Sequence, residues 1–467
     1  MAYRNLDEFI IRLEQENEHI TSSTTNGFLV VQDIFASAKR IAWALNVENL
    51  DILSQQVGEF ILPGTSLSSL MSRAGSLMSA IRQVNGVKSP PVQAVCLPPD
   101  LSVLPHIYQA KQDSHPTIPF VQIVTQDGYN HGGCVAIYDS NTLGVSLNHH
   151  EPIPAAIVIG SDPAIMWSTH APLPAQFDPY WLAGWLRHKS VHLTQGISQP
   201  VSYPADAEIV IEGIIHPQET LPPAYLGDSD GFYRTIQHFK RMEVTSITHR
   251  ENAIFPLITV DDTYWINKAV ERLFLPILKL LLEEVIDIHI PQCGAGRNLI
   301  IISIKKQRTG DAYKVLHGIW GIGELAYHRA VVVVDEDVNI YDLHAVKDAV
   351  FQRVNWQEDV IISRGITHPQ DLINPHGIGA KIGIDATRKL GSPSRIWDNA
   401  VRFTHDPADA MHHPDDHIMI LNPQVDLTQK DLVWRYILAG VDWQQDFQIN
   451  RNRVIIDATR KLEWTSQ

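Results

Sequence analysis

Glycines surround a lysine in one short segment that could bind an anion. Gly377, Gly379 and Gly383 flank Lys381. Glycines allow backbone N–H groups to approach a phosphate closely, and the lysine would add a positive charge. The segment fits neither the dinucleotide-binding fingerprint nor the Walker loop. It is either a phosphate-binding loop or a plain turn with positive φ angles, and turns of that kind are the more common.

Two further segments carry clustered polar side chains. Three acids at 335–337 follow the apolar run 331–334. Such a cluster can hold a divalent cation, although acids at this place more often end a strand and cap the next helix. The segment 411–417 mixes histidines and aspartates as a metal site would, but Pro414 and the lack of apolar flanks favour a solvated loop. The sequence contains no nucleophile elbow, HExxH motif or kinase motif set.

The elements that must position these residues fall into a β-rich block and an α/β block. Between about 118 and 260, β-branched runs predict strands at 121–124, 135–138, 155–159 and 208–215. Before that block, apolar spacing predicts helices at 6–13, within 36–57 and at 66–83. After 267 the sequence predicts helices at 268–282, 311–327 and 343–352 and strands at 299–304 and 330–334. This alternation favours a parallel sheet.

The heptapeptide at 384–390 recurs at 456–462, and two copies are too few for a solenoid.

Composition narrows the class of protein. The chain has 467 residues, which is typical of about three domains, and its net charge of −15 argues against nucleic acid as a general partner. Three cysteines, Cys96, Cys134 and Cys293, are too few and too widely spaced for a disulfide framework, so we expect a reducing compartment. The first residues lack the pattern of a signal peptide, and no apolar run reaches about 18 residues. We therefore expect a cytoplasmic protein.

Several collinear segments resemble the UbiD family of decarboxylases. They are 157–164, 182–186, 204–213, 226–233, 248–254, 304–310, 331–338 and 379–387. Two of them read Glu208-Ile-Val-Ile-Glu212-Gly213 and Leu226-Gly227-Asp228-Ser-Asp-Gly231. The resemblance extends from about 118 to 390.

The resemblance implies an α/β and β fold with three domains: an N-terminal α/β domain at 1–117, a central split β-barrel that binds flavin at 118–290, and a C-terminal α/β dimerisation domain at 291–467. It also implies reversible, non-oxidative decarboxylation of aromatic or α,β-unsaturated acids. The family's cofactor is prenylated FMN, which a flavin prenyltransferase supplies and which Mn²⁺ and K⁺ anchor. The flavin provides the electron sink, and the protein provides placement and proton transfer. A homodimer or a higher homo-oligomer is expected.

The resemblance assigns roles to three residues. Glu212 falls on the family's metal-binding glutamate, and a carboxylate suits a hard cation. A packing or hydrogen-bonding role for this glutamate is equally open. Lys381 falls on a lysine that contacts the flavin phosphate. Asp262 falls near the catalytic acid, which in the family sits in a "P-P-D-E" turn that here is shortened to Val260-Asp261-Asp262.

Other positions depart from the family pattern. The family's "N-x-x-x-Y-R" becomes Cys134-Val-Ala-Ile-Tyr138-Asp139, and a metal-binding histidine becomes Ser146. Cys134 and Ser146 are therefore expected in the cofactor site in place of metal ligands, unless a register slip brings Asn130 into place. Asp139 reverses a charge, would repel a carboxylate substrate, and with Asp262 forms a candidate acid–base pair.

These departures leave three hypotheses. The protein is a working decarboxylase with a modified pocket, an enzyme of the same fold with cofactor-independent chemistry, or a non-catalytic binding or scaffold subunit. The resemblance leaves the substrate open.

Overall fold

The computed structural model describes residues 3–61, 83–128, 130–147, 149–173, 177–227, 231–368, 371–374, 376–391 and 396–463. The helix predicted at 66–83 lies outside these residues except for Gln83. The chain divides into two compact units, the first ending at Val270 and the second comprising Glu271–Glu463. The predicted boundaries at 117/118 and 290/291 remain a prediction.

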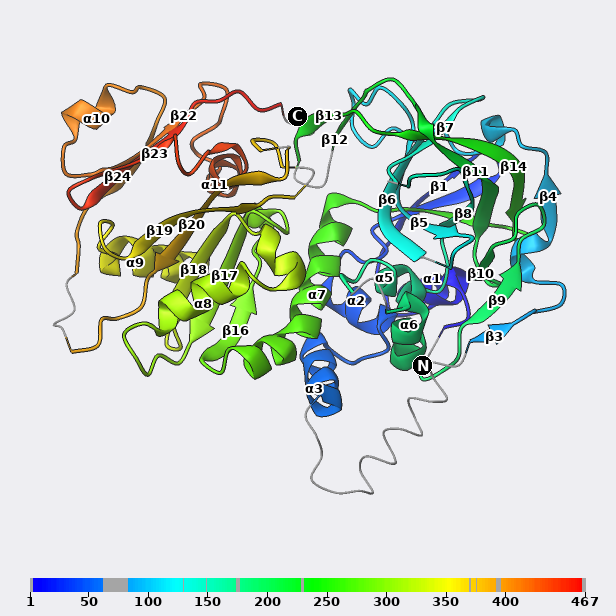
Figure 1. Cartoon of the computed structure of the whole chain (residues 1–467), viewed down its shortest axis with the longest axis horizontal. Helices are drawn as coiled ribbons and strands as arrows, with labels where there is room; N and C mark the ends of the chain where they lie inside the picture. The colour runs from blue at the N-terminus through cyan, green and yellow to red at the C-terminus, as the bar shows by residue number, and fades with distance from the viewer. Residues whose placement is uncertain are drawn as a thin grey trace. The chain divides into compact units, whose positions relative to one another are not determined.

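A closed antiparallel barrel forms the centre of the first unit (Figure 1). Its strand order is β11-β8-β5-β6-β7-β14, pairing of β14 with β11 closes the ring, and β4 adds to the outside of β14. The strands are β4 (Val95–Leu97), β5 (Thr117–Thr125), β6 (Asn130–Tyr138), β7 (Leu143–Val145), β8 (Ile153–Ile159), β11 (Ile209–Thr220) and β14 (Lys240–His249).

Alternating side chains fill this barrel, because successive residues of a strand point to opposite faces. Ile209 and Ile211 of β11 belong to the interior core, together with Ile157 of β8. Val210 and Val158 instead join a second apolar cluster outside the barrel, under the segment that contains β9 and β10. The interior is thus a packed core, and the polar residues of interest lie on the outside or at the ends of strands.

Smaller elements surround the barrel. The sheet β1-β2-β15 joins the N-terminal segment to the strand that follows the barrel, with β15 parallel to β2. These elements are α1 (Leu6–Gln15), β1 (Thr21–Thr25), β2 (Phe28–Gln32), α2 (Ala38–Ala44), α3 (Leu50–Ile61), β3 (Val84–Asn85), η1 (Pro91–Gln93), η2 (Leu101–Val103), α5 (Pro163–Ser168), α6 (Pro179–Arg187), β9 (His192–Gln195), β10 (Ser202–Pro204), β12 (Ala224–Gly227), β13 (Tyr233–Ile236) and β15 (Ile254–Leu257).

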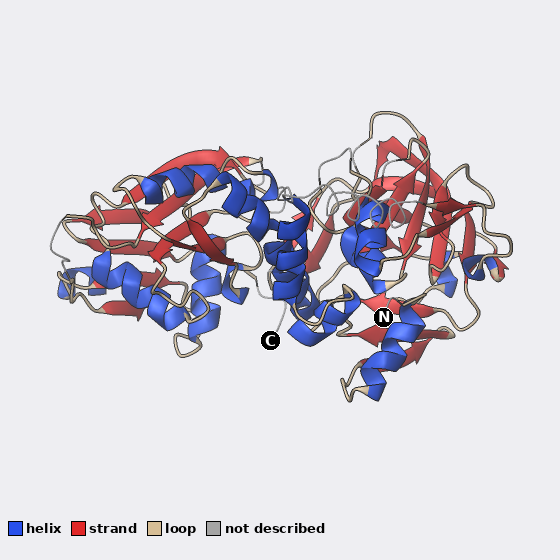
Figure 2. Ribbon diagram, turned by 90° about the horizontal axis from the view of Figure 1, so that it is seen from below, coloured by secondary structure: helices blue, strands red, loops and turns tan. Residues whose placement is uncertain are grey.

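The second unit alternates helices and strands (Figure 2). Its first sheet has the order β16-β17-β18-β20-β19, in which β17, β18 and β20 are parallel. Leucines of α7 and apolar residues of α8 pack on one face of β17 and β18. The elements are α7 (Val260–Leu281), which begins in the first unit, and β16 (Val285–His289), η3 (Gln292–Gly294), β17 (Leu299–Ile304), α8 (Asp311–Ile319), η4 (Gly323–Tyr327), β18 (Ala330–Asp335), α9 (Leu343–Arg353), β19 (Val360–Ile366) and β20 (Ile378–Asp385).

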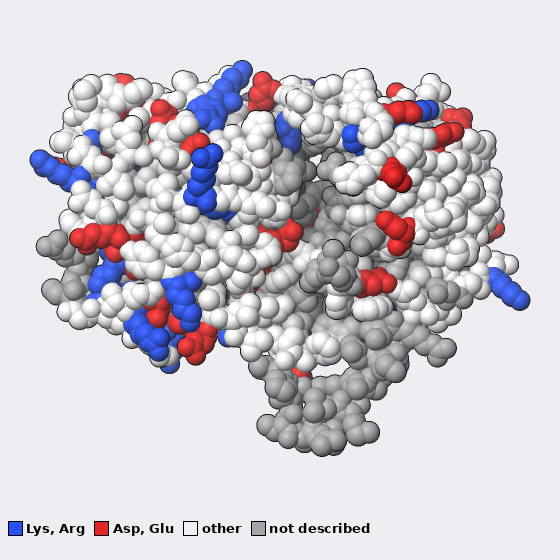
Figure 3. All heavy atoms as spheres, viewed as in Figure 1, with Lys and Arg blue, Asp and Glu red and all other residues white. Residues whose placement is uncertain are grey.

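A second sheet follows, with the order β21-β22-β24-β23. Its elements are β21 (Val401–Thr404), α10 (Asp409–His412), β22 (His417–Leu421), α11 (Lys430–Gly440), β23 (Phe447–Asn450) and β24 (Arg453–Ala458). Among the described residues, no helix is long and apolar enough to cross a membrane. On the face that Figure 3 shows, lysines and arginines are interspersed with acids.

The predicted glycine loop around Lys381 is wrong, because the segment is strand β20. Of Gly377, Gly379 and Gly383, only Gly377 has a positive φ, of 81°. The other glycines allow close packing: a Cβ on Gly379 would lie 2.5 Å from the side chain of Asn374, and one on Gly383 would lie 3.0 Å from Trp320. The glycines therefore reflect neighbours that leave no room for a side chain.

Candidate active site

Glu212 is the centre of the best-organised polar site on the barrel. It lies on β11 two residues after Val210 and therefore on the same face of the strand, which points out of the barrel. Its side chain is completely buried. Its Oε1 accepts hydrogen bonds from the N–H of Ile197 at 2.8 Å and the hydroxyl of Tyr203 at 2.7 Å. Its Oε2 accepts from the N–H of Ser198 at 2.6 Å, the Ser198 hydroxyl at 2.9 Å and the N–H of Gln199 at 2.8 Å.

The loop that encloses Glu212 joins β9 to β10 and begins at Gly196. A Cβ at this position would lie 2.4 Å from the carbonyl oxygen of Gln199 and 3.0 Å from Glu212 Oε2, so only glycine allows the loop to close on the carboxylate. Thr245 of β14 extends the network, since its hydroxyl lies 2.6 Å from the Ser198 hydroxyl and donates to the Glu212 carbonyl at 3.2 Å. No motif in the sequence marks this loop as part of a site.

This arrangement does not fit a metal ion at Glu212. A carboxylate offers about four acceptor positions, and five donors of the chain already point at this one. Across the described ranges, no group of three or more His, Cys, Asp and Glu residues is arranged to hold a metal ion. Of the two roles left open by the sequence, the geometry favours the hydrogen-bonding one, and we derive no step through a metal.

Asn130, the alternative metal ligand, lies on the same row of the sheet as Glu212. Glu212 pairs with Ala156, Ala156 with Val124, and Val124 with Asn130. Three strand spacings of about 4.8 Å separate the two backbones by about 14 Å, which is too far for both side chains to reach one ion. The Asn130 amide oxygen instead accepts a 2.8 Å hydrogen bond from Gln122.

The structure does not bring Cys134 and Ser146 to Glu212, and their place in a cofactor site stays a prediction. Cys134 belongs to the core inside the barrel, and burial raises the pKa of its thiol to about 12. Ser146 is exposed, and its hydroxyl accepts a 3.0 Å hydrogen bond from the N–H of Val135. The cysteine therefore faces the opposite side of the barrel wall from Glu212.

The acid pair of Asp139 and Asp262 also stays a prediction, and each of the two side chains has a local structural role. Asp139 is exposed in the turn between β6 and β7, where its Oδ1 accepts from the N–H groups of Asn141 and Thr142 at 2.8 and 2.7 Å. Burial raises the pKa of Asp262, and the nearby carboxylate that adds to this rise is that of Asp33. Asp139, which reverses the charge of the family pattern, thus stabilises a turn.

Asp262 itself is buried at the first turn of α7. It accepts from the N–H of Phe35 at 2.6 Å and the N–H of Thr259 at 2.8 Å, and its own N–H donates to the Thr259 hydroxyl at 3.3 Å. This reciprocal pairing is a capping box. Burial raises the pKa of Asp262 to about 6, and the nearby charge of Asp33 adds to that rise, while the hydrogen bonds oppose it. The side chain could therefore carry a proton near neutral pH, but its contacts are those of a helix cap.

Lys381, expected on a flavin phosphate, lies buried in the second unit. Its amino group donates to the carbonyl of Ala326 and, at 3.3 Å, to the carbonyl of His328. Burial lowers its pKa to about 8, with the charge of Arg329 adding to that effect and that of Asp371 opposing it. With its donors directed at carbonyl groups, the ammonium group is not presented to a phosphate in this conformation.

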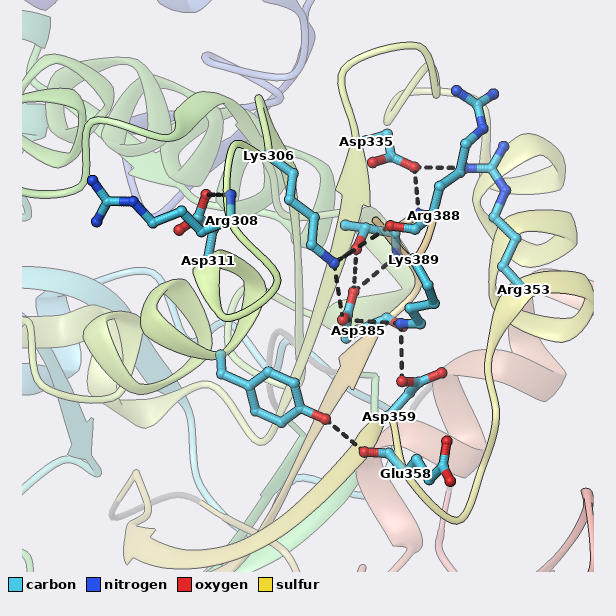
Figure 4. A network of polar contacts seen from close by, with 12 residues as sticks. Lys306, Arg308, Asp311, Asp335, Arg353, Glu358, Asp359, Asp385, Arg388 and Lys389 are labelled. Carbon is cyan, nitrogen blue, oxygen red and sulfur yellow. Dashed lines mark hydrogen bonds and ion pairs between the residues drawn. The ribbon is translucent and has the colours of Figure 1, made fainter. Parts of the chain in front are cut away.

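The acids at the carboxyl end of the parallel sheet are paired with cations (Figure 4). Asp335 accepts from Arg353 at 3.1 Å and from the N–H of Arg388 at 2.8 Å. Asp385 lies 2.9 Å from Lys389 and 3.5 Å from Lys306. Ligands often bind at this edge of an α/β sheet, but here the charges neutralise one another, so the cation site considered from the sequence is not formed.

One cavity of about 230 Å³ lies in the first unit, lined by residues that include Arg4, Arg187, Lys189 and Asp206. Its arginines already have acidic partners: Arg187 lies 3.2 Å from Asp162, and Arg4 pairs with Glu8. Burial raises the pKa of Asp162 to about 6, and Arg187 opposes that rise. None of the predicted site residues lines this cavity.

Comparison with known proteins identifies the class of this fold. Two family models match end to end: the 3-octaprenyl-4-hydroxybenzoate carboxy-lyase Rift-related domain over residues 84–262 and the C-terminal domain of the same carboxy-lyase over 264–386. The first match contains the strands of the closed barrel, and the second contains the first sheet of the α/β unit. The chain belongs to the UbiD family, and the predicted family and fold class are confirmed.

Relatives and solved structures agree with this assignment. An uncharacterized protein of Archaeoglobus fulgidus is 30% identical over 474 residues, covering 86% of this chain and 96% of its own. One of Aquifex aeolicus is 33% identical over 413 residues, covering 80% and 84%. The UbiD-class enzyme HmfF from Pelotomaculum thermopropionicum, solved with FMN, matches with a TM-score of 0.70 at 21% identity over 83% of this chain and 95% of that one. The closed form of vanillic acid decarboxylase from Sedimentibacter hydroxybenzoicus gives 0.67 at 20% identity over 88% and 97%.

Proposed function

We propose that this protein is a UbiD-like carboxy-lyase that decarboxylates an aromatic or α,β-unsaturated carboxylic acid without net oxidation. The observation that carries the proposal is the pair of adjacent carboxy-lyase models, which together span residues 84–386. Structures similar to this chain include HmfF bound to FMN and an evolved dimeric HmfF bound to prenylated FMN. Prenylated FMN from a flavin prenyltransferase and a homo-oligomeric state complete the proposal, whereas the Mn²⁺ and K⁺ that the resemblance implies do not fit at Glu212 in this conformation.

When bound, the flavin would supply the electron sink for loss of CO₂. Cys134 lies in the barrel core, the Ser146 hydroxyl accepts from a backbone N–H, and the Lys381 amino group donates to carbonyl groups, so we derive no step through the flavin. The chain itself contributes the loop 196–199, whose three successive N–H groups hold one carboxylate and form the type of concavity that binds anions.

A second candidate function is supported by the same loop. Because Glu212 is saturated by hydrogen bonds within the chain, the protein could have lost the metal and flavin and act either through cofactor-independent chemistry or as a non-catalytic subunit. The two candidates differ in whether the purified protein retains a flavin.

The deciding experiment is co-expression with a flavin prenyltransferase. We would record the visible absorption spectrum, identify the released flavin by mass spectrometry, and measure manganese in the same sample. Stoichiometric flavin with CO₂ release from cinnamate-type or hydroxybenzoate-type acids supports the decarboxylase. A colourless, folded protein under conditions that load a UbiD-class control enzyme would contradict it and favour the second candidate.

A further inference from the structure

The repeated heptapeptide is the end of a much longer internal repeat. Residues 330–360 align without a gap on residues 417–447, with a constant offset of 87. The same residue stands at these pairs of positions: Val338 and Val425, Val346 and Val433, Val354 and Val441, Trp356 and Trp443, Gln357 and Gln444, and Asp359 and Asp446. We call residues 330–390 the first module and residues 417–462 the second module.

The two modules have the same topology. In the first, β18 is parallel to β20 and β19 pairs antiparallel with β20, and in the second β22, β24 and β23 repeat this arrangement. In each module the first strand, β18 or β22, also pairs in parallel with the strand that precedes it in the chain, β17 or β21. The register is also shared: Val360 pairs with Ile384, and the equivalent Phe447 pairs with Ile456.

The turns repeat to the level of single hydrogen bonds. Asp359 accepts the N–H of Asn355 at 2.7 Å, and Asp446 accepts the N–H of the equivalent Asp442 at 2.8 Å. The carbonyl of Asp359 accepts from Asp385 at 2.9 Å, and that of Asp446 accepts from Asp457 at 2.8 Å. Such agreement in backbone detail identifies two copies of one structural unit.

The modules contact each other through equivalent surfaces. The guanidinium of Arg329, next to Ala330, donates to the carbonyls of Leu438 at 3.1 Å and Ala439 at 3.0 Å, at the end of α11. In return, the ring of Phe351 lies 5.0 Å from the ring of His417. With the offset of 87, Phe351 is equivalent to Leu438 and Ala330 to His417. The contact is therefore reciprocal, as in an interface between two copies related by a two-fold axis.

This interface is well built. Arg329 is 1% exposed and also lies 3.3 Å from Asp371, so its charge is compensated on the first-module side. His417 is fully buried, and the ring of Trp356 lies 5.7 Å from it. The N–H of Trp356 donates to Asn452 at 3.0 Å. Aromatic side chains and a buried arginine at the centre are typical of a strong protein interface.

We propose that the second module is a built-in partner: within the same chain, it occupies the face of the first module that fits a second copy of that module. The matched family model ends at residue 386, so the second module lies beyond it. It follows that this face is closed in the folded chain, and that any assembly of the protein uses a different surface. The proposal does not depend on the decarboxylase activity.

The test joins the two modules covalently in the full-length protein. Phe351→Cys and His417→Cys would be combined in a Cys96→Ser background, since Cys96 is the exposed cysteine. Oxidation while the chain folds should then form a disulfide between the two positions within one chain, identified by peptide mass spectrometry together with a single-chain mass on a non-reducing denaturing gel. The native mass by light scattering should be the same with and without the link. Single-cysteine variants are the controls.

A second variant tests the interface without new cysteines. Arg329→Met should loosen the second module and let chains exchange it, so the native mass should rise with protein concentration. Arg353→Met, whose side chain pairs with Asp335 inside the first module, should leave the mass unchanged. The proposal is overturned if the cysteine pair links different chains or fails to link, or if locking the modules disrupts the native assembly. If Arg329→Met does not fold, the cross-linking result alone decides.

Discussion

The hydroxyl of Tyr203 lies 2.7 Å from Oε1 of Glu212, and this contact holds the β9–β10 loop against the barrel wall. Burial raises the pKa of Tyr203, so the phenol keeps its proton and remains a donor at neutral pH. Gln93 in turn donates to the same hydroxyl at 2.9 Å. The buried carboxylate is therefore the organising centre of a loop rather than an open ligand.

This relationship predicts the result of Glu212→Gln. The amide has one acceptor oxygen where the carboxylate has two, so the N–H groups that now face Oε2 would lose their partner. We expect the free energy of unfolding to fall by about 2–4 kcal/mol, since hydrogen bonds to a buried charged group contribute strongly. Urea denaturation followed by circular dichroism measures this change.

The control for this variant is Glu243→Gln, on the exposed side chain that pairs with His216. It should change the unfolding free energy by less than about 0.5 kcal/mol. If Glu212→Gln leaves the stability unchanged but lowers flavin and metal content together, Glu212 is a metal ligand after all.

The sequence predicted the architecture better than the site. The β-branched runs at 155–159 and 208–215 correctly marked barrel strands, and the run at 299–304 coincides with β17, because alternation and β-branching are local properties. Whether Cys134 lies inside or outside the barrel depends on which face of β6 points inward. A one-residue shift in strand register would reverse that face.

Local hydrogen bonding explains the roles of the two candidate acids. Asp139 and Asp262 are residue types that suit catalysis, but Asx turns and capping boxes use the same side chains. The Thr259-x-x-Asp262 spacing was a visible capping signal that sequence reasoning overlooked. The partners of Glu212 at 197–199 carried no comparable signal, since backbone N–H groups are the donors.

Thiol reactivity should separate the three cysteines. Burial raises the pKa values of Cys134 and Cys293 to about 12, so both are protonated at neutral pH as well as inaccessible. We expect one thiol, that of Cys96, to react rapidly with Ellman's reagent in the native protein and all three to react in denaturant. Cys96→Ser should remove the rapid phase. Rapid labelling of Cys134 would contradict its place inside the barrel.

Stability should depend on the protonation of Asp262. Because its folded-state pKa of about 6 lies above the unfolded value near 4, the folded protein holds this proton more tightly. The resulting stability is present below about pH 4 and is lost as pH rises through 6, on the order of 3 kcal/mol at 1.36 kcal/mol per pKa unit.

Asp162 and Glu208 shift in the same direction, so the informative quantity is the difference between wild type and Asp262→Asn. We expect the fall in unfolding free energy between pH 4 and pH 7 to be smaller in this variant. Asp261→Asn, at the exposed neighbouring position, is the control and should keep the wild-type slope. Equal slopes for wild type and Asp262→Asn would mean that Asp262 titrates normally in the folded state.

Lys381 should act on stability rather than on phosphate binding. Burial lowers its pKa from 10.5 to about 8, so between these values the unfolded chain binds more protons than the folded one. Its stabilising contribution is therefore lost as pH falls through 8, and the unfolding free energy should rise as pH increases from 7.5 to 9.5. Lys381→Met should flatten this rise, whereas Lys305→Met, at an exposed position, should preserve it.

Titration calorimetry with inorganic phosphate at low salt should give the same affinity for wild type and Lys381→Met. A weaker affinity in the variant, restored to equality at high salt, would show instead that the ammonium group leaves the carbonyls of Ala326 and His328 to bind an anion.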